Sequence, residues 1–113
     1  MENAPGFLIT LATPAGRRQV RCGANEFIWN AAARAGIALP AICHQGRCLT
    51  CAARLTAGEV DNSASVSYFK EDREAGFVLL CTGRPGSDVE VETHQAEAMR
   101  AWRRARGLPA PYA

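Results

Sequence analysis

The sequence predicts an α+β fold, in which short strands form a sheet and one main helix covers a face of it. Strand-like segments lie near both ends of the chain, and a helical pattern of apolar residues lies between them. With 113 residues and 48% hydrophobic content, the chain is long enough for one domain with its own core. We therefore expect a single folding unit.

The first third of the chain is expected to form a β-hairpin followed by the main helix. The expected elements, in order, are a strand at 7–12, a turn at 14–16, a strand at 18–22 and a helix at 27–35. Asn25 is the expected N-cap, and Gly36 is expected to stop the helix. Pro40 disfavours any continuation of the helix.

The second half of the chain is expected to complete the sheet and to end in a helix. The expected elements are strands at 52–56, around Val60, at 77–80 and at 89–92, a helical turn at 68–74, a turn at 84–87, a helix at 94–106 and a loose end at 108–113. Val89 to Glu92 alternates apolar and charged side chains, which is typical of a half-buried strand. The apolar run that begins at Phe77 is expected to be a buried strand that delivers Cys81.

Cysteines are concentrated in the stretch Cys43-His44-Gln45-Gly46-Arg47-Cys48-Leu49-Thr50-Cys51. At about 100° per residue, a helix would place Cys48 beside Cys51 but turn Cys43 well away from both. A loop wrapped around a central object can bring all three inward, and Gly46 allows the positive φ or close backbone approach that a tight wrap needs. The spacing predicts an irregular loop around a small group that prefers thiolates, with Cys81 as a fourth ligand.

The number of cysteines favours metal binding over a disulfide framework. The chain has five, an odd number. Because no apolar run is long enough for a membrane span and the start lacks the features of a signal peptide, we expect a cytoplasmic protein, in which thiols rarely pair. Cys22, the fifth cysteine, is expected to be a small buried side chain and not a ligand.

The net charge of +2 is unevenly distributed. Residues 1–94 are close to neutral, whereas residues 95–113 are basic. The basic residues of this last segment are Arg100, Arg103, Arg104 and Arg106. Because no aromatic or glycine-rich pattern accompanies them, we do not expect binding to nucleic acid. They are interpreted as a solvated face or a partner contact, and we predict that this helix helps docking on an acidic partner.

The complete spacing, Cys43-x4-Cys48-x2-Cys51-x29-Cys81, resembles that of plant-type 2Fe-2S ferredoxins. The resemblance extends over roughly residues 7–97. Further segments that look like their family counterparts are Leu39-Pro40, Gly58 with Val60-Asp61, 74–79, 87–89 and 92–94. The resemblance implies a β-grasp fold, a mixed sheet packed on a helix, with a 2Fe-2S cluster held by the four cysteines.

A protein of this family would be a one-electron carrier and not itself an enzyme. The loop sequence of this chain, Cys-x-Gln-Gly-x-Cys-x-Thr-Cys, is similar to that of ferredoxins that serve bacterial oxygenases. Since no nucleotide-binding glycine motif or flavin site is visible, we expect a separate NAD(P)H-dependent flavin reductase as electron donor and an oxygenase-like acceptor. We expect a monomer, with residues 1–98 as the ferredoxin-type domain and residues 99–113 as a basic C-terminal extension.

Two other functions stay open at the level of sequence. One is a repair ferredoxin that re-reduces the iron of a ring-cleaving dioxygenase. The other is a zinc-stabilised binding module, because four thiolates also satisfy tetrahedral zinc. Zinc sites usually pair two short C-x-x-C knuckles, and this chain has one.

The chain's two histidines and one arginine of the cysteine loop also have expected roles. His44 is expected to be an exposed loop residue, and His94 resembles a structural histidine of the family. Arg47 places a cation beside an anionic cluster, which should favour the reduced form. We therefore hypothesise that Arg47→Ala or Arg47→Glu lowers the reduction potential.

Overall fold

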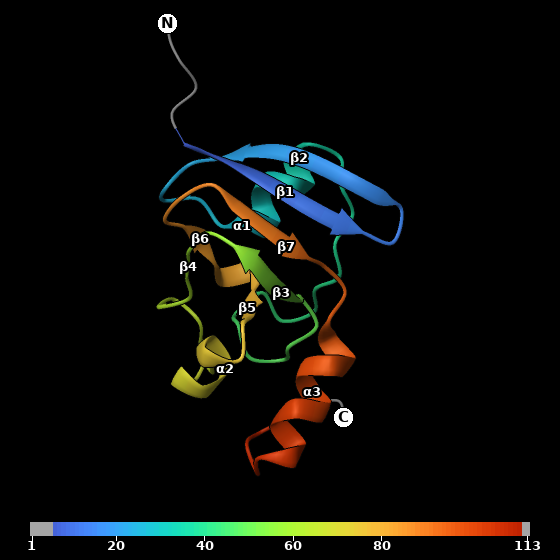
Figure 1. The fold of residues 1–113 in the computed structure, drawn as a ribbon, viewed down its shortest axis with the longest axis vertical. Coiled ribbons are helices and arrows are strands. Elements are labelled where there is room, and N and C mark those ends of the chain that lie inside the picture. Colours follow the sequence, from blue (N-terminus) through green and yellow to red (C-terminus); the bar gives the residue numbers. More distant parts are fainter. Residues whose placement is uncertain (1–5, 112–113) are drawn as a thin grey trace, which may run out of the picture.

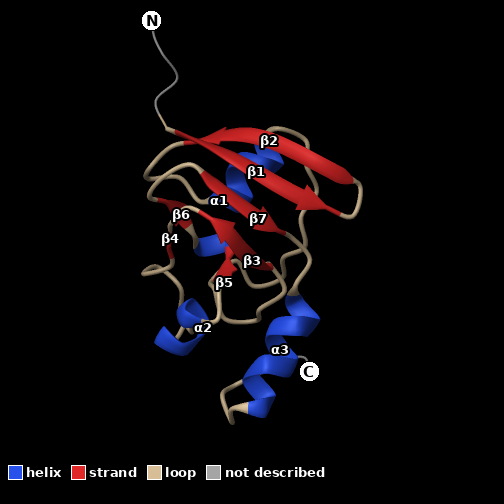
Figure 2. Ribbon diagram, viewed as in Figure 1, coloured by secondary structure: helices blue, strands red, loops and turns tan. Residues whose placement is uncertain are grey.

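A five-stranded mixed sheet is the centre of the computed structural model, which describes residues 6–111 (Figures 1 and 2). The strand order is β2-β1-β7-β3-β5. These strands are β1 (Phe7–Thr13), β2 (Gly16–Cys22), β3 (Ala52–Ala57), β5 (Phe77–Leu79) and β7 (Val89–Glu92). β1 and β7 are parallel, and the other neighbouring pairs are antiparallel. A second, two-stranded sheet pairs β4 (Val60–Asp61) with β6 (Arg84–Pro85).

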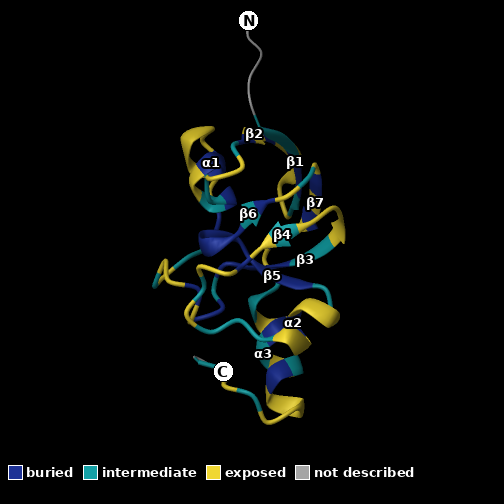
Figure 3. Cartoon of the chain, turned by 90° about the vertical axis from the view of Figure 1, so that its left-hand side faces the viewer, coloured by how far each residue is buried: buried dark blue, intermediate teal, exposed yellow. Residues whose placement is uncertain are grey.

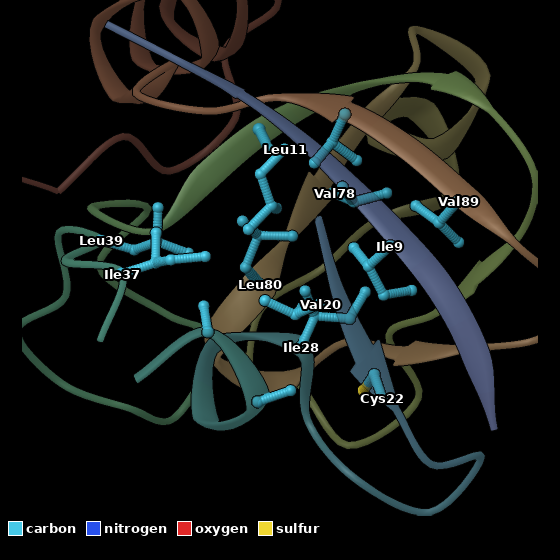
Figure 4. Packing of buried hydrophobic residues seen from close by; sticks show 14 residues of the cluster. Ile9, Leu11, Val20, Cys22, Ile28, Ile37, Leu39, Val78, Leu80 and Val89 are labelled. Carbon is cyan, nitrogen blue, oxygen red and sulfur yellow. The ribbon is translucent and has the colours of Figure 1, made fainter. Parts of the chain in front are cut away.

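Helix α1 (Ile28–Arg34) covers one face of the sheet, behind the strands in Figure 1. Its buried residues join a cluster of apolar side chains from the strands and from the segment after the helix, part of which is labelled in Figure 4. Ile9, Leu11 and Ile28 are wholly buried in this cluster. The mixed sheet and its covering helix confirm the expected α+β, β-grasp fold.

The two ends of α1 are stabilised in different ways. The expected N-cap at Asn25 is wrong, because the helix begins after Phe27, which makes no side-chain cap. Instead, the Ile28 amide donates to the Gly83 carbonyl at 2.8 Å, so a tertiary contact satisfies a free amide of the first turn. The expected stop at Gly36 is confirmed: its φ is 80°, and the Ile37 amide donates back to the Ala32 carbonyl at 2.9 Å, the Schellman pattern.

Two further expectations are corrected near the fourth cysteine. Residues 84–85, expected in a turn, form β6, because the backbone there pairs with β4. Cys81 lies two residues past the end of β5, on the 3-10 turn η1 (Leu80–Thr82), instead of at the strand end itself. The strand expected around Val60 and the one expected from Phe77 are both confirmed.

Helices α2 (Lys70–Glu74) and α3 (Ala96–Ala105) lie at the end of the molecule away from the β1–β2 hairpin (Figure 1). α3 is built into a second apolar cluster, since its Met99 is wholly buried against Leu49, Cys51 and Cys81. Buried positions alternate with exposed ones along this helix (Figure 3). The predicted C-terminal helix is therefore confirmed, and its inner face touches the cysteine loop.

Within the described residues, no helix is both long enough and apolar enough to cross a membrane.

Candidate metal centre

Strand pairing brings Cys51 and Cys81 together although they are 30 residues apart. β3 and β5 are antiparallel, with Ala52 opposite Leu79, so the start of one strand lies beside the end of the other. Cys51 directly precedes β3, and Cys81 follows β5. Their sulfur atoms are 2.9 Å apart, well beyond the about 2.05 Å of a disulfide bond, and both thiols are free.

Cys43 and Cys48 come from the loop between α1 and β3, and the backbone curls around the first of them. The amides of Gln45 and Cys48 both donate to the Cys43 sulfur, each at 3.4 Å. Cys43 is half-buried, whereas the other three predicted ligands are buried. Amide groups that no strand ladder uses therefore already point at sulfur, the arrangement that stabilises an anionic thiolate.

The environment favours the thiolate form of two of these cysteines. The hydrogen bond from Cys51, and another from the Gly46 backbone, lower the pKa of the Cys81 thiol to about 6. Burial alone would raise the pKa of Cys48, but hydrogen bonds involving Thr50 and Cys43 lower it to about 7. Cys51 is the donor to Cys81, and its pKa is raised for that reason and by burial. Thiolates are the form that binds metal.

The loop keeps its shape through backbone conformations that most residues avoid. His44, Gly46 and Leu49 all have positive φ, at 54°, 72° and 68°. At Gly46 a side chain is excluded by space as well, because a Cβ there would lie 2.4 Å from Thr82 Oγ1 and 2.5 Å from Ser65 Cβ. Only glycine fits this position. His44 is exposed, as expected, and its ring meets the Trp29 ring edge-on, with the centroids 4.6 Å apart.

A second loop supports the site from the side of Cys81. Asn62 is buried, donates from Nδ2 to the Leu79 carbonyl at 2.8 Å and accepts from the Leu79 amide at 3.2 Å. Ser65 Oγ lies 2.6 Å from Thr82 Oγ1, next to the fourth cysteine. The end of β5, just before the turn that carries Cys81, is thus fixed by side chains of the segment that follows β4.

Sequence reasoning also missed Thr50 and Arg100 as part of the site. Arg100 Nη2 donates to the Cys48 carbonyl at 2.8 Å and to Thr50 Oγ1 at 3.0 Å. Thr50 lies between two cysteines and belongs to the loop motif, but nothing in the sequence indicates its contact with Arg100. Arg100 gives no local signal, because the residues it contacts are 50 and 52 positions earlier in the chain.

Cys22 lies outside the group, at the end of β2, and is only 1% exposed. Its thiol donates to the Glu26 carbonyl at 3.3 Å. Burial, helped by the nearby Glu26 carboxylate, raises its pKa to about 11. These features agree with its interpretation as a small buried side chain.

The donor set fits an iron-sulfur cluster. Within residues 6–111, no group of three or more His, Cys, Asp or Glu side chains is arranged around the position of one metal ion. The Cys51 and Cys81 sulfurs are 2.9 Å apart, and the Cys43 sulfur accepts a hydrogen bond from the Cys48 amide. An all-thiol set with backbone amides directed at sulfur suits a group larger than a single ion, whose sulfur ligands accept hydrogen bonds.

Comparison with known proteins supports the same group. Residues 12–86 match the family described as the 2Fe-2S iron-sulfur cluster binding domain. The chain is 39% identical over 77 residues to Ferredoxin-2 of a Synechococcus species, an alignment that covers 68% of this chain and 73% of that protein. It is 35% identical over 104 residues to the reductase subunit of an aromatic O-demethylase from an Amycolatopsis species.

Two of the proteins that this chain resembles are covered only in part by it. The alignment with the reductase subunit covers 90% of this chain but 31% of the relative. The crystal structure of Pectocin M2 superposes with a TM-score of 0.73 at 26% identity, covering 89% of this chain and 39% of that one. The chain thus corresponds to less than half of either of these two larger proteins.

Proposed function

Because this chain belongs to the family of 2Fe-2S iron-sulfur cluster binding domains, we propose that Cys43, Cys48, Cys51 and Cys81 are the four ligands of its cluster. Membership of the family makes the protein a ferredoxin-type electron carrier. The observation that carries the ligand assignment is the contact between the Cys51 and Cys81 sulfurs, which the pairing of β3 with β5 brings about. It joins the distant cysteine to the loop that supplies the other three.

A bound 2Fe-2S cluster supplies reversible one-electron chemistry, with a formal charge of about −2 when oxidised and about −3 when reduced. The chain's own part is to hold that charge near the surface with little rearrangement. The Gln45 and Cys48 amides donate to the Cys43 sulfur. The buried side chains of Leu49 and Met99 pack against Cys51 and Cys81 and exclude water from the inner side of the site. The half-buried Cys43 marks the side from which a partner can approach.

For partners, we propose an NAD(P)H-dependent flavin reductase as electron donor and an oxygenase-like protein as acceptor. The likeness to a reductase subunit of an aromatic O-demethylase supports this assignment, because that alignment covers 90% of this chain. A repair ferredoxin for a ring-cleaving dioxygenase is the second candidate, and it would use the same site. The zinc-stabilised module is not retained, since the family binds a 2Fe-2S cluster.

Three further proposals concern the oligomeric state, nucleic acid and the organisation of the chain. We propose that the protein acts as a monomer, does not bind nucleic acid, and is divided at residue 98 into the ferredoxin-type domain and the basic extension. The docking role predicted for the arginines is now assigned to Arg104 and Arg106, which are exposed. Arg103 is 0% exposed and cannot contribute to such a surface.

Purification with iron and sulfide present tests the cofactor and the carrier function together. We expect about two irons and two sulfides per chain, visible absorption that bleaches with dithionite, and a paramagnetic signal of about one unpaired electron per chain after reduction. A colourless protein that binds zinc and does not respond to dithionite would contradict the proposal.

A further inference from the structure

Arg100 connects the C-terminal helix to the loop that holds three of the proposed ligands. From α3 it reaches back with Nη2 to the Cys48 carbonyl, at 2.8 Å, and to Thr50 Oγ1, at 3.0 Å. Its side chain is half-buried. Its guanidinium is therefore a positive charge held against the proposed ligand loop, whereas the charge of Arg47 in the same loop is exposed to solvent.

Two neighbours on α3 fix the position of Arg100. Met99 is wholly buried in the apolar cluster that includes Cys51 and Cys81. One turn later, Arg103 is wholly buried and pairs with Asp72 through two hydrogen bonds, at 2.6 and 3.1 Å. A helix anchored at 99 and 103 cannot rotate freely, so the contact of Arg100 with the loop belongs to the folded structure.

The direction of the hydrogen bonds follows from the chemistry of the groups. A guanidinium has donors and no acceptor, so Thr50 Oγ1 must accept from Arg100. The hydroxyl proton of Thr50 is then free to point elsewhere, and the Cys48 sulfur lies 3.3 Å away. A thiolate that binds metal has no proton and can only accept. With Cys48 as a ligand, the hydroxyl of Thr50 becomes the donor to its sulfur.

We propose that Arg100 is a positioning residue that directs the Thr50 hydroxyl toward the Cys48 sulfur, and that this chain of two hydrogen bonds raises the reduction potential of the cluster. The inference rests on the proposed ligation by Cys48. Reduction adds negative charge to the cluster and its sulfur ligands. A hydrogen bond to a ligand sulfur, strengthened by a cation behind the donor, stabilises the reduced form more than the oxidised form.

A double-mutant cycle separates this arrangement from a simple effect of charge. We expect Thr50→Val to lower the midpoint potential and Thr50→Ser, which keeps the hydroxyl, to leave it close to the wild-type value. Arg100→Gln should also lower the potential. Its effect should be clearly smaller in the Thr50→Val background, because the group through which it acts is then missing. Arg104→Gln removes the same charge from an exposed position of the same helix, and we expect it to leave the midpoint potential close to the wild-type value.

A spectroscopic measurement on the same proteins reports the hydroxyl proton itself. In the reduced wild-type holoprotein, electron-nuclear double resonance should detect an exchangeable proton coupled to the cluster that disappears in deuterated water. We expect this coupling to be absent in Thr50→Val, retained in Thr50→Ser and weakened in Arg100→Gln. A role of Arg100 in folding alone would not change the coupling while the cluster is present.

The outcomes distinguish this proposal from the one on which it rests. If the wild-type protein forms no cluster, the ligand assignment fails. If the cluster forms and Thr50→Val leaves both the potential and the proton coupling unchanged, the positioning role is overturned. Equal lowering by Arg100→Gln with and without Thr50 would overturn it as well. If Arg100→Gln does not assemble a cluster, the potentials and proton couplings of Thr50→Val and Thr50→Ser test the role of the hydroxyl, since both variants keep Arg100.

Discussion

At the scale of single residues, Gly46 controls whether the cysteine loop can close. Its φ of 72° and the short distances from an added Cβ to Thr82 and Ser65 exclude any side chain. Gly36 has a similar φ, 80°, but no atom lies within 4 Å of its added Cβ. The two glycines therefore separate the cost of backbone conformation from the cost of crowding.

We predict that Gly46→Ala costs about 2 to 4 kcal/mol of folding stability and reduces cluster assembly, whereas Gly36→Ala costs about 1 kcal/mol and leaves assembly unchanged. Urea denaturation and the iron content per chain measure the two effects. Equal losses in the two variants would show that crowding by Thr82 and Ser65 is unimportant.

Cys22 gives a second prediction at this scale, because its raised pKa makes it an unreactive thiol. With a pKa of about 11, it should be alkylated slowly by iodoacetamide in the folded holoprotein up to about pH 10, and faster only above that. The folded state holds this proton more tightly than the unfolded chain, in which the thiol has its ordinary pKa of 9.0, so the contribution to stability is lost as pH rises from 9.0 to about 11. Fast labelling at pH 8, followed by mass spectrometry, would contradict the buried role.

At the scale of elements, α3 is part of the fold and not a loosely attached tail. Arg103 forms its ion pair with Asp72 at 0% exposure, donates to the Ser67 carbonyl at 2.8 Å, and stacks over the Phe69 ring. Asp72 Oδ2 also accepts from the Phe69 amide at 2.8 Å, which caps α2. Truncation after Glu97 would therefore remove core contacts as well as charge, and it cannot by itself test docking.

We predict that Asp72→Asn destabilises the protein by about 3 to 5 kcal/mol, because it leaves the buried Arg103 charge without its partner. Glu74→Gln on the same helix is the matched control: its pair with Lys70, at 3.9 Å, is exposed, and the loss should stay below about 0.5 kcal/mol. The denaturation midpoints of the Asp72→Asn and Glu74→Gln holoproteins measure the two losses of stability. Similar midpoints would mean that α3 is not anchored by this pair.

Local patterns in the sequence predicted most of the elements but not the contacts between them. The turn and strand signals located β1, β2, β3 and β7, and the spacing of the cysteines indicated the site. The N-cap of α1 was missed because the Gly83 carbonyl, far along the chain, replaces a side-chain cap. From sequence alone, Arg100 and Arg103 indicate a solvated face or a partner contact, because nothing in their own segment shows that Thr50 and Asp72 lie opposite them. Tertiary pairing of this kind leaves no periodic signal.

At the scale of the whole molecule, two large apolar side chains are exposed beside the cysteine loop. Ile42 and Val66 are the large hydrophobic residues that stand out as exposed in the described part of the chain, at 59% and 62%. Ile42 directly precedes Cys43, and the Val66 amide donates to the Gln45 carbonyl at 2.8 Å, so both flank the loop. An exposed apolar pair beside a redox site is typical of a contact surface for a partner.

We predict that Ile42→Gln and Val66→Gln slow electron transfer between this protein and a flavin reductase at least about tenfold together, through loss of about 1.4 kcal/mol of apolar contact. The visible spectrum and the thermal midpoint should be unchanged. Stopped-flow reduction at two salt concentrations measures the rates, and the loss should persist at both, because burial of apolar surface is not screened by salt. Wild-type rates in the double variant would place the contact elsewhere.

The most direct test of the account is the iron and acid-labile sulfide content of five alanine variants, purified in parallel with iron and sulfide available. We predict that Cys43→Ala, Cys48→Ala, Cys51→Ala and Cys81→Ala each lose the cluster, whereas Cys22→Ala keeps about two irons and two sulfides per chain. A full cluster in any of the first four variants, or loss of the cluster in Cys22→Ala, would contradict the assignment of these four thiols as the ligands.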